Sequence, residues 1–204
     1  MERTGLINKV KIKMDEYTPD GVALPFEETI GPILDECARE ILEKTPLPLL
    51  TPSIIPFEGV IYKSDKAYIP VPSDYVRLYE IKFPLWKKSI RRAISTQDDE
   101  YKIQENEYIK AGYSRPVVAI VTTSLTAGDP PGKYFECAKV LSEGAPTPIA
   151  LYVKTDKPEN LNDILSDPLT WLCASKVLGI VNQIDAAKLA YDQFTSSMEG
   201  LVIT

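Results

Sequence analysis

The chain has 204 residues, of which 44% are hydrophobic and 25% are charged, and its net charge is −6 with a pI near 4.9. This composition fits one folded domain, or one domain with an appended subdomain. No apolar run approaches the roughly 18 residues of a membrane span, and the N-terminus has no signal-peptide core, so we expect no membrane contact and maturation in a cytoplasm. An acidic chain also disfavours a protein that grips nucleic acid by neutralising its phosphates.

Residues 1–24 show no clear periodicity, and we expect an extended N-terminal arm that orders only against a neighbour. The next segment, 26–44, is predicted to be an amphipathic helix that ends at Pro46. Its apolar positions share one face: Ile30, Ile33, Leu34, Cys37, Ile41 and Leu42. Four prolines in residues 46–56 then predict a stiff, extended connection.

Strand candidates dominate residues 57–154, a region that we expect to form a β-rich insertion. They are short β-branched or alternating runs separated by turn residues: 57–62, 67–71, 75–83, 116–123, 134–141 and 149–154. A polar stretch, 98–110, interrupts them. Helices flanking a run of strands indicate an α+β fold, with a helical bundle and an antiparallel sheet.

Two helices are expected after the strands, a short one over 160–165 and a long one over 168–198. Along the long helix, apolar residues recur at steps of three and four and fill one face: Leu169, Cys173, Val177, Ile180, Ile184, Ala187, Tyr191, Phe194 and Met198. A second apolar patch on nearly the opposite side comprises Ala174, Leu178 and Val181. We therefore expect this helix to pack on its own core with one face and on a neighbouring subunit with the other.

Residues 200–204 form the predicted C-terminal tail. After Gly200 the chain ends in the apolar, β-prone residues Leu201, Val202 and Ile203, followed by Thr204. An isolated domain rarely leaves such a tail in water, so we expect it to dock on a partner by adding to a sheet edge or filling a groove.

The chain contains no histidine, which removes histidine-based triads, histidine metal sites and the commonest general base at neutral pH. It has no phosphate-binding glycine loop and no paired-cysteine zinc spacing. The three cysteines, Cys37, Cys137 and Cys173, lie far apart and are expected to be reduced core thiols. Only carboxylate, lysine or tyrosine chemistry remains. The run 98–100 (Asp-Asp-Glu) is either a Mg²⁺ ligand set or, as we prefer, the acidic start of a helix. We therefore expect no catalytic residue, metal or cofactor.

One basic cluster stands out against the acidic background. It lies beside Trp86 and centres on Lys87, Lys88, Arg91 and Arg92, with Lys82 close by. The cluster either touches DNA backbone or forms a solvated or salt-bridging face at a subunit contact, and the net charge favours the second interpretation. Lys176 lies at the edge of the long helix's apolar face, where snorkelling or an inter-subunit ion pair would account for it.

In their order and spacing, several landmarks resemble the head-to-tail adaptor proteins of tailed bacteriophages, most closely the ring proteins of crAss-like phages. These landmarks cover residues 26–198: the first helix ending at Pro46; the strand entries 72–78 (PSDYVRL) and 115–119 (RPVVA); the run 148–153 (PIALYV); and a late helix carrying Asp185, Ala186, Ala187, Ala190 and Phe194.

This resemblance implies a helical bundle with a strand-rich insertion, assembled as a ring, expected to be a dodecamer, beneath the portal. The ring would sit at the head–tail junction of the virion after assembly in the host bacterial cytoplasm. It would bind the portal protein and the next tail or ring protein, and it would extend the channel through which genomic DNA passes without sequence recognition. The family has no catalytic residues. The proline-rich 46–56 segment and the polar 98–110 stretch depart from its usual pattern.

Three functions are therefore weighed: a structural connector ring of the virion, a cytoplasmic enzyme that uses a carboxylate or a lysine, and a non-viral oligomeric adaptor. The connector accounts together for the two-faced helix, for the eleven tyrosines and seventeen prolines, and for the missing histidine. The enzyme accounts for none of these. We accordingly predict a structural protein.

Overall fold

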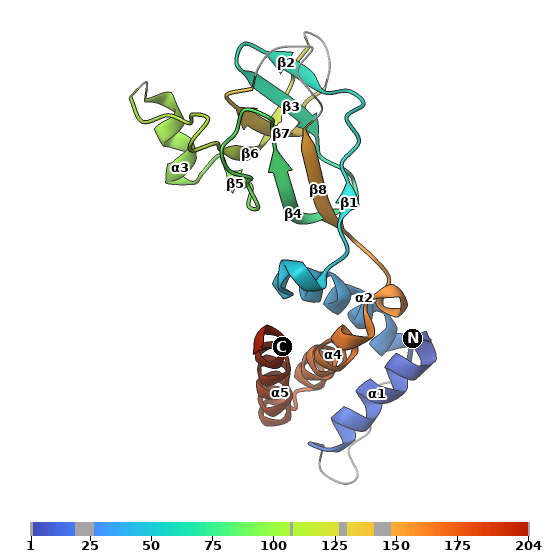
Figure 1. Cartoon of the computed structure of the whole chain (residues 1–204). Coiled ribbons are helices and arrows are strands. Elements are labelled where there is room, and N and C mark those ends of the chain that lie inside the picture. Colours follow the sequence, from blue (N-terminus) through green and yellow to red (C-terminus); the bar gives the residue numbers. More distant parts are fainter. Residues whose placement is uncertain (1, 19–26, 107, 127–129, 141–147, 204) are drawn as a thin grey trace. The chain divides into compact units, whose positions relative to one another are not determined.

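The computed structural model of the chain describes residues 2–18, 27–106, 108–126, 130–140 and 148–203. Residue contacts divide the chain into two compact units. Met1–Leu50 and Thr155–Thr204 form one unit, called the helical unit here, and Thr51–Lys154 form the other, called the sheet unit (Figure 1). The predicted α+β class is confirmed. The sheet unit has a hydrophobic core of its own. The organisation as one domain with a β-rich insertion stays a prediction.

Among its described residues, the helical unit consists mostly of four helices: α1 (Arg3–Asp15), α2 (Glu27–Lys44), α4 (Ser166–Ile180) and α5 (Ile184–Ile203). Short 3₁₀ turns lie at η1 (Leu47–Leu49), η3 (Pro158–Asn160) and η4 (Asp163–Leu165). Helix α4 is central and packs against α1, α2 and α5. Because α4 is apolar on nearly all sides, it can be covered by three neighbours at once.

The prediction of an extended arm over residues 1–24 is wrong for Arg3–Asp15, because these residues form α1. Leu6, Val10 and Met14 recur every four residues and are buried against the rest of the unit, which fixes the helix. Lys13 is also buried: its Nζ lies 4.2 Å from the centre of the Trp171 ring and donates to the backbone carbonyl of Asp167 at 3.0 Å. Residues 19–24 of the predicted arm lie outside the described residues.

The single helix expected over 168–198 is two helices, α4 and α5. Asn182 adopts a left-handed conformation, with φ of 60°. The N–H of Gln183 then bonds to the carbonyl of Leu178 at 2.9 Å, and the N–H of Asn182 to that of Gly179 at 3.2 Å. This pair of bonds is a Schellman motif, which satisfies the last carbonyls of α4 and reverses the chain. The short helix expected over 160–165 is replaced by the turns η3 and η4.

In the described part of the sheet unit, eight strands build two sheets: β1 (Ser53–Ile54), β2 (Ile61–Lys63), β3 (Lys66–Pro70), β4 (Tyr75–Lys82), β5 (Ile94–Ser95), β6 (Val118–Thr123), β7 (Gly132–Ala138) and β8 (Ile149–Lys154). One sheet has the order β1-β8-β4 and the other β2-β3-β7-β6-β5. All pairs are antiparallel except β5 with β6. The helix α3 (Asp99–Lys102) and the turn η2 (Ile103–Glu105) follow β5.

The core of the sheet unit draws side chains from both sheets. Tyr75 meets Phe135 edge-on at 5.2 Å between ring centres and stacks on Tyr152 at 6.4 Å. The hydroxyl of Tyr152 donates to Asp74 at 2.9 Å, so the polar end of this ring is satisfied where it leaves the core. Burial raises the pKa of Tyr75 to about 12, which keeps its hydroxyl neutral at physiological pH.

Candidate functional site

The apolar patch assigned to a neighbouring subunit belongs largely to the chain's own core. Ala174 and Leu178 are fully buried on α4, and Val181, at the end of this helix, is half-buried. The reason is the turn at Asn182, which folds α5 back onto α4 so that both faces of α4 are covered within the helical unit. The interpretation of Ala174 and Leu178 as partner-facing residues is therefore wrong.

The predicted C-terminal tail is a continuation of α5, which extends to Ile203. Leu201 is 9% exposed and packs within the chain. The prediction that it docks on a partner is therefore wrong for this residue. The β-propensity of these residues is overridden because α4 offers an apolar surface to one side of the helix. The side chains of Val202 and Ile203 lie outside the described part of the structure, as does Thr204.

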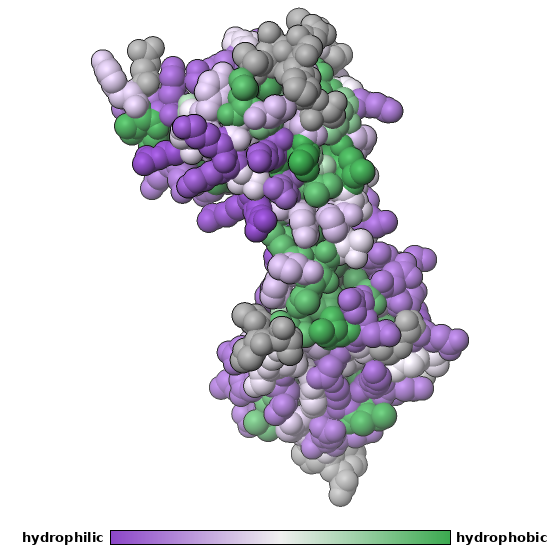
Figure 2. All heavy atoms as spheres, in the orientation of Figure 1, coloured by the Kyte–Doolittle hydropathy of each residue, from purple (hydrophilic) through white to green (hydrophobic). Residues whose placement is uncertain are grey.

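Helix α5 presents a broad unpartnered face. Its buried positions form one narrow seam: Ala186, Ala190, Phe194 and Leu201. Three large apolar side chains stay in water on the flanks, with exposed fractions of 58% for Ile184, 50% for Leu189 and 45% for Tyr191. Apolar side chains also reach the surface elsewhere in both units (green in Figure 2). A helix buried along so narrow a seam has most of its surface free for a partner.

Three carboxylates follow the pole of α5 opposite that seam: Asp185, Asp192 and Glu199. They are spaced by seven residues, which turns each one only about 20° from the last and separates them by about 10 Å along the axis. All three are exposed, and among the described residues none pairs with a cation. The outer face of α5 is therefore acidic along its centre and apolar at its sides.

A shallow groove of about 310 Å³ lies along one flank of α5, where the end of α2 meets it. Tyr191, Phe194 and Met198 line it from α5, and Lys44 and Pro46 line it from the other side. The Nζ of Lys44 lies 5.2 Å from the centre of the Phe194 ring. Its pKa is raised by a hydrogen bond to Glu40, at 2.7 Å, so the cation persists over the ring.

The basic cluster lies on an irregular segment between β4 and β5, and its four cations, Lys87, Lys88, Arg91 and Arg92, are all exposed. Trp86 anchors the segment: its side chain is only 2% exposed, and its Nε1 donates to the carbonyl of Lys139 at 2.9 Å. A bridge between Ile81 and Ile90 fixes the other end. In the described part of the sheet unit these cations have no ion-pair partner, so an anionic surface can approach them.

The acidic run at 98–100 begins α3, as the preferred interpretation predicted. Asp98 accepts a hydrogen bond from the N–H of Ser95 at 2.8 Å, and Asp99 pairs with Lys102 at 2.9 Å. No cluster of three metal-binding side chains occurs in the described ranges. Beyond α3 the chain exposes Tyr108, which is 96% exposed, and Ile109 beside it. This apolar tip is a second surface available to a partner.

A polar pocket of about 480 Å³ opens on one face of the five-stranded sheet. Glu136 is almost fully buried in it, yet its carboxylate accepts from Lys66 at 2.7 Å and from the hydroxyl of Tyr68 at 3.1 Å. Burial and the negative charge of Glu136 raise the pKa of Tyr68, so the phenol keeps its proton and donates. This group was not predicted from the sequence, although a glutamate between the apolar residues Phe135 and Cys137 was a signal.

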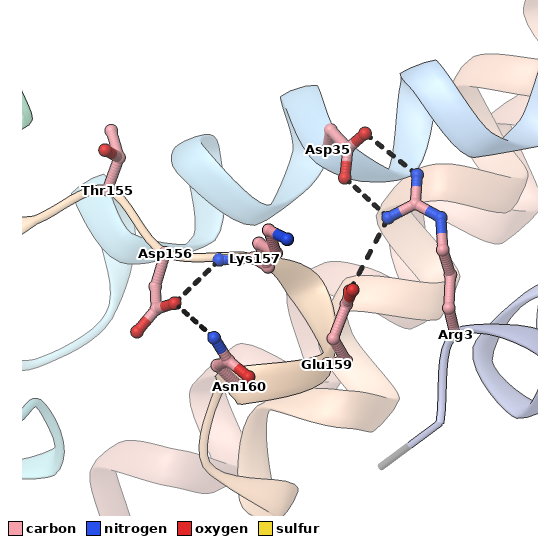
Figure 3. A pocket seen from close by; sticks show the side chains of 7 residues that line it. All are labelled: Arg3, Asp35, Thr155, Asp156, Lys157, Glu159 and Asn160. Atoms are coloured by element: carbon pink, nitrogen blue, oxygen red, sulfur yellow. Dashed lines mark hydrogen bonds and ion pairs between the residues drawn. The ribbon is translucent and has the colours of Figure 1, made fainter.

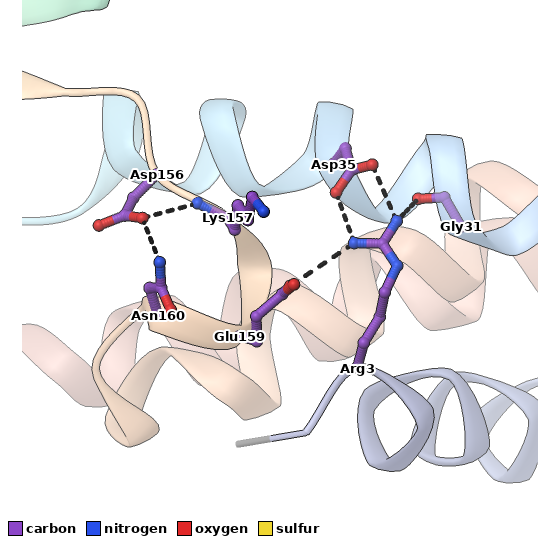
Figure 4. A network of polar contacts seen from close by, with 7 residues as sticks. All are labelled: Arg3, Gly31, Asp35, Asp156, Lys157, Glu159 and Asn160. Carbon is purple, nitrogen blue, oxygen red and sulfur yellow. Dashed lines mark hydrogen bonds and ion pairs between the residues drawn. The ribbon is translucent and has the colours of Figure 1, made fainter.

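A second missed group centres on Arg3 (Figures 3 and 4). Its guanidinium makes two hydrogen bonds of 2.8 Å to the carboxylate of Asp35 and one of 3.0 Å to the carbonyl of Gly31, both on α2. It also lies 3.5 Å from Glu159 of η3. Arg3 thereby joins three segments of the helical unit, and it lowers the pKa of Asp35 through the bidentate bond.

The Arg3 group borders a pocket of about 940 Å³, which Figure 3 shows from close by. On its far side Asp156 accepts from the N–H of Lys157 and from the side-chain amide of Asn160, both at 2.8 Å. These bonds hold η3 where the chain re-enters the helical unit after β8. Since the polar groups around the pocket bond mainly to one another, we assign this site a structural role.

Lys176, at the edge of the apolar face of α4, pairs inside its own chain. Its Nζ lies 2.7 Å from Glu36 and 2.8 Å from Glu40 of α2. Burial alone would lower the pKa of Lys176, but these two carboxylates outweigh it and raise the pKa. The ion pair is therefore intramolecular, in place of the inter-subunit pair considered from the sequence.

Known proteins add no family assignment, because neither protein-family models nor curated proteins match this chain. Among the described residues, no helix is both long enough and apolar enough to cross a membrane. The chain's candidate sites are thus the unpartnered surfaces: the outer face of α5, the basic segment and the tip at Tyr108 and Ile109.

Proposed function

We propose that this protein is a structural component of a phage virion, a subunit of the connector ring between portal and tail. The observation that carries the proposal is the presence of exposed, large apolar side chains on unlike surfaces of both units. Ile184, Leu189 and Tyr191 lie on α5, and Tyr108 and Ile109 lie beyond α3. A ring of identical subunits needs two different complementary surfaces on each copy, because its interfaces are heterologous.

The distribution of charge supports the same proposal. The helical unit has nine Lys and Arg residues against 17 Asp and Glu, whereas the sheet unit has 14 against 12. A strongly acidic unit joined to a slightly basic one suits head-to-tail contact between copies, because opposite potentials steer association. The order of landmarks that resembles phage adaptors fits this arrangement and implies the dodecamer.

In this proposal the ring binds the portal on one side and the next tail or ring protein on the other. It lines a channel for the genomic DNA at the head–tail junction. An acidic lining suits DNA that must slide without sticking, since tight non-specific binding requires clustered positive charge. The proposal assigns no catalytic step, metal or cofactor to the chain.

The alternative, an enzyme that uses a carboxylate or a lysine, would depend on Glu136 and Lys66. The carboxylate of Glu136 already accepts hydrogen bonds from Lys66 and from the hydroxyl of Tyr68, so its charge is compensated. A general base needs a free lone pair aimed at its substrate. The arrangement therefore favours a structural role for Glu136. A non-viral oligomeric adaptor would share the assembly but would not bind a portal.

Negative-stain electron microscopy and native mass spectrometry of the purified protein, alone and mixed with the portal of the same phage, test the proposal. We expect closed annular particles, with twelve subunits, at least in the presence of the portal. A Tyr108→Ser/Ile109→Ser variant, measured beside the wild type, should show whether the tip is needed for contact between subunits or for contact with the portal. A protein that stays monomeric at every concentration and ignores the portal would contradict the proposal. Rings that ignore the portal would point to the non-viral adaptor.

A further inference from the structure

We propose that the basic segment of one copy docks on the outer face of α5 in the next copy around the ring. The basic segment is Lys87, Lys88, Arg91 and Arg92, together with the exposed Leu85. The inference rests on the proposed ring and deepens it by naming the two surfaces that meet.

The outer face of α5 and the basic segment carry complementary charges. Asp185, Asp192 and Glu199 line the outward pole of α5 over about 21 Å, and in the described structure no cation pairs with them. Among the described residues, the four cations of the basic segment likewise have no ion-pair partner. One cation, Lys188, shares the acidic pole, so the face keeps a net negative charge.

Apolar side chains lie beside the charges on both surfaces. Leu189 and Tyr191 flank the acidic pole of α5, and Leu85 precedes the buried Trp86 in the basic segment. Stable interfaces combine an apolar centre with charges at the rim, where the charges select the partner and the register. Trp86 holds the segment in place, which reduces the entropy lost on docking.

The charge balance of the chain favours a second copy over DNA as the partner of the basic segment. Four cations on one segment are few beside a net charge of −6, which repels the DNA backbone. Every copy instead carries a matching acidic face of its own type, and two unlike surfaces on one chain make a contact that repeats around a ring. Binding of duplex DNA by the segment is thus an outcome that would overturn the inference.

Charge reversal tests the contact in the full-length protein. One variant is Lys87→Glu/Lys88→Glu/Arg91→Glu/Arg92→Glu, and the other is Asp185→Lys/Asp192→Lys/Glu199→Lys. Each alone should lose at least about tenfold in association at low salt, because like charges then face each other. A 1:1 mixture should recover assembly with alternating variants, since both of its contacts are again between opposite charges. Analytical ultracentrifugation and native mass spectrometry measure this.

Two controls keep the result interpretable. A variant with Lys63, Lys110, Arg115 and Lys133 changed to Glu has the same net charge as the first variant, at exposed sites outside the segment, and it should assemble as the wild type does. Far-UV circular dichroism should show unchanged folding in all variants, because every altered side chain is exposed. High salt should weaken the wild-type assembly, since about 1 M salt shortens the screening length to about 3 Å.

The failures are distinguishable. Wild-type rings with reversed variants that also form rings would overturn this contact and leave the proposed function standing. Failure of the 1:1 mixture to assemble would likewise overturn the contact between copies. So would a loss of assembly caused by altered folding of the single chain, which would not depend on protein concentration. Reversed variants that assemble but lose binding to duplex DNA would reassign the basic segment to DNA. A wild-type protein that never assembles, alone or with the portal, would remove both proposals.

Discussion

The hydroxyl of Ser175 donates a hydrogen bond of 2.8 Å to the backbone carbonyl of Ala187, from the middle of α4 to the first turn of α5. Ser175 is itself buried, so the bond satisfies a polar group inside the helix pair. Together with the turn at Asn182, it fixes the antiparallel pairing of the two helices. The outer face of α5 exists because of this pairing.

The turn itself can be tested at Asn182, whose φ of 60° suits asparagine or glycine. Asn182→Ala should destabilise the helical unit by about 1 kcal/mol, since a Cβ without a local hydrogen bond is strained there. Asn182→Gly is the matched control and should be near neutral. Urea unfolding followed by far-UV circular dichroism measures both, and equal stability of the two variants would argue against the left-handed turn.

Leu178 should behave as a core residue. Leu178→Ala is expected to cost about 2–5 kcal/mol of unfolding free energy, because the side chain is fully buried between helices. Leu189→Ala on the exposed face of α5 should cost less than about 0.5 kcal/mol. Chemical denaturation of the two variants compares them directly. A stable, fully folded Leu178→Ala protein would mean that this face of α4 is open after all.

The Arg3–Asp35 bond predicts a pH dependence. Arg3 holds the pKa of Asp35 below its ordinary value of 3.8, so the stabilisation is complete above that value and is lost as the pH falls through the lower, folded-state pKa. Arg3→Ala should therefore cost about 1 kcal/mol near neutral pH, a modest figure because both side chains are partly exposed.

The difference between wild type and Arg3→Ala should shrink in strong acid to the part that the bond to the Gly31 carbonyl contributes, as measured by urea titrations at a series of pH values. Arg39→Ala is the control, because Arg39 makes a single, longer bond of 3.4 Å to Glu43 on the surface of α2. A penalty for Arg3→Ala that does not change with pH would show that packing, and not the ion pair, is responsible.

The three cysteines should be inert in the native protein. Cys37, Cys137 and Cys173 are all buried and free, and a hydrogen bond to Cys37 together with burial raises the pKa of Cys173. A neutral, inaccessible thiol reacts slowly with disulfide reagents. Ellman's reagent should therefore count close to zero thiols before unfolding and three afterwards. Rapid reaction of any thiol in the folded state would contradict its placement.

Free protein should bind duplex DNA weakly. With only the basic segment to displace counterions, a gel shift at physiological salt should show negligible binding. The Lys87→Gln/Lys88→Gln/Arg91→Gln/Arg92→Gln variant is the comparison and should behave the same. Tight, salt-sensitive binding that this variant loses would turn the function towards nucleic-acid recognition.

The sequence was most informative where one face of an element is buried. Helix α2 matches its expected range closely, since the apolar residues of 26–44 repeat with a helical period. Helix α1 was missed because Leu6, Val10 and Met14 are separated by charged residues, and Lys13, one of them, is itself buried. Only tertiary contact with α4 makes that helix favourable.

Other features could not be predicted from the local pattern of apolar residues alone. The apolar residues of α5 continue the helical spacing of those in α4, so the sequence pattern predicts a single helix. Only the left-handed conformation of Asn182 ends the first helix. Leu201 was predicted to be a strand residue from the β-propensity of its neighbours. Its burial in α5 outweighs that propensity. The Glu136 pocket and the Arg3 group join residues far apart in sequence, and a single sequence carries no record of such pairings.

The insertion of the sheet unit between α2 and α4 has a consequence for synthesis on the ribosome. Residues 51–154 are complete and able to fold while residues 155–204 are still being translated, a delay of about 3–10 s at ordinary elongation rates. During this time α1 and α2 lack α4, and short helices are marginal alone. A nascent chain that terminates early thus carries a finished sheet unit on an unfinished helical one, and its bare apolar surface is the kind that chaperones and proteases recognise.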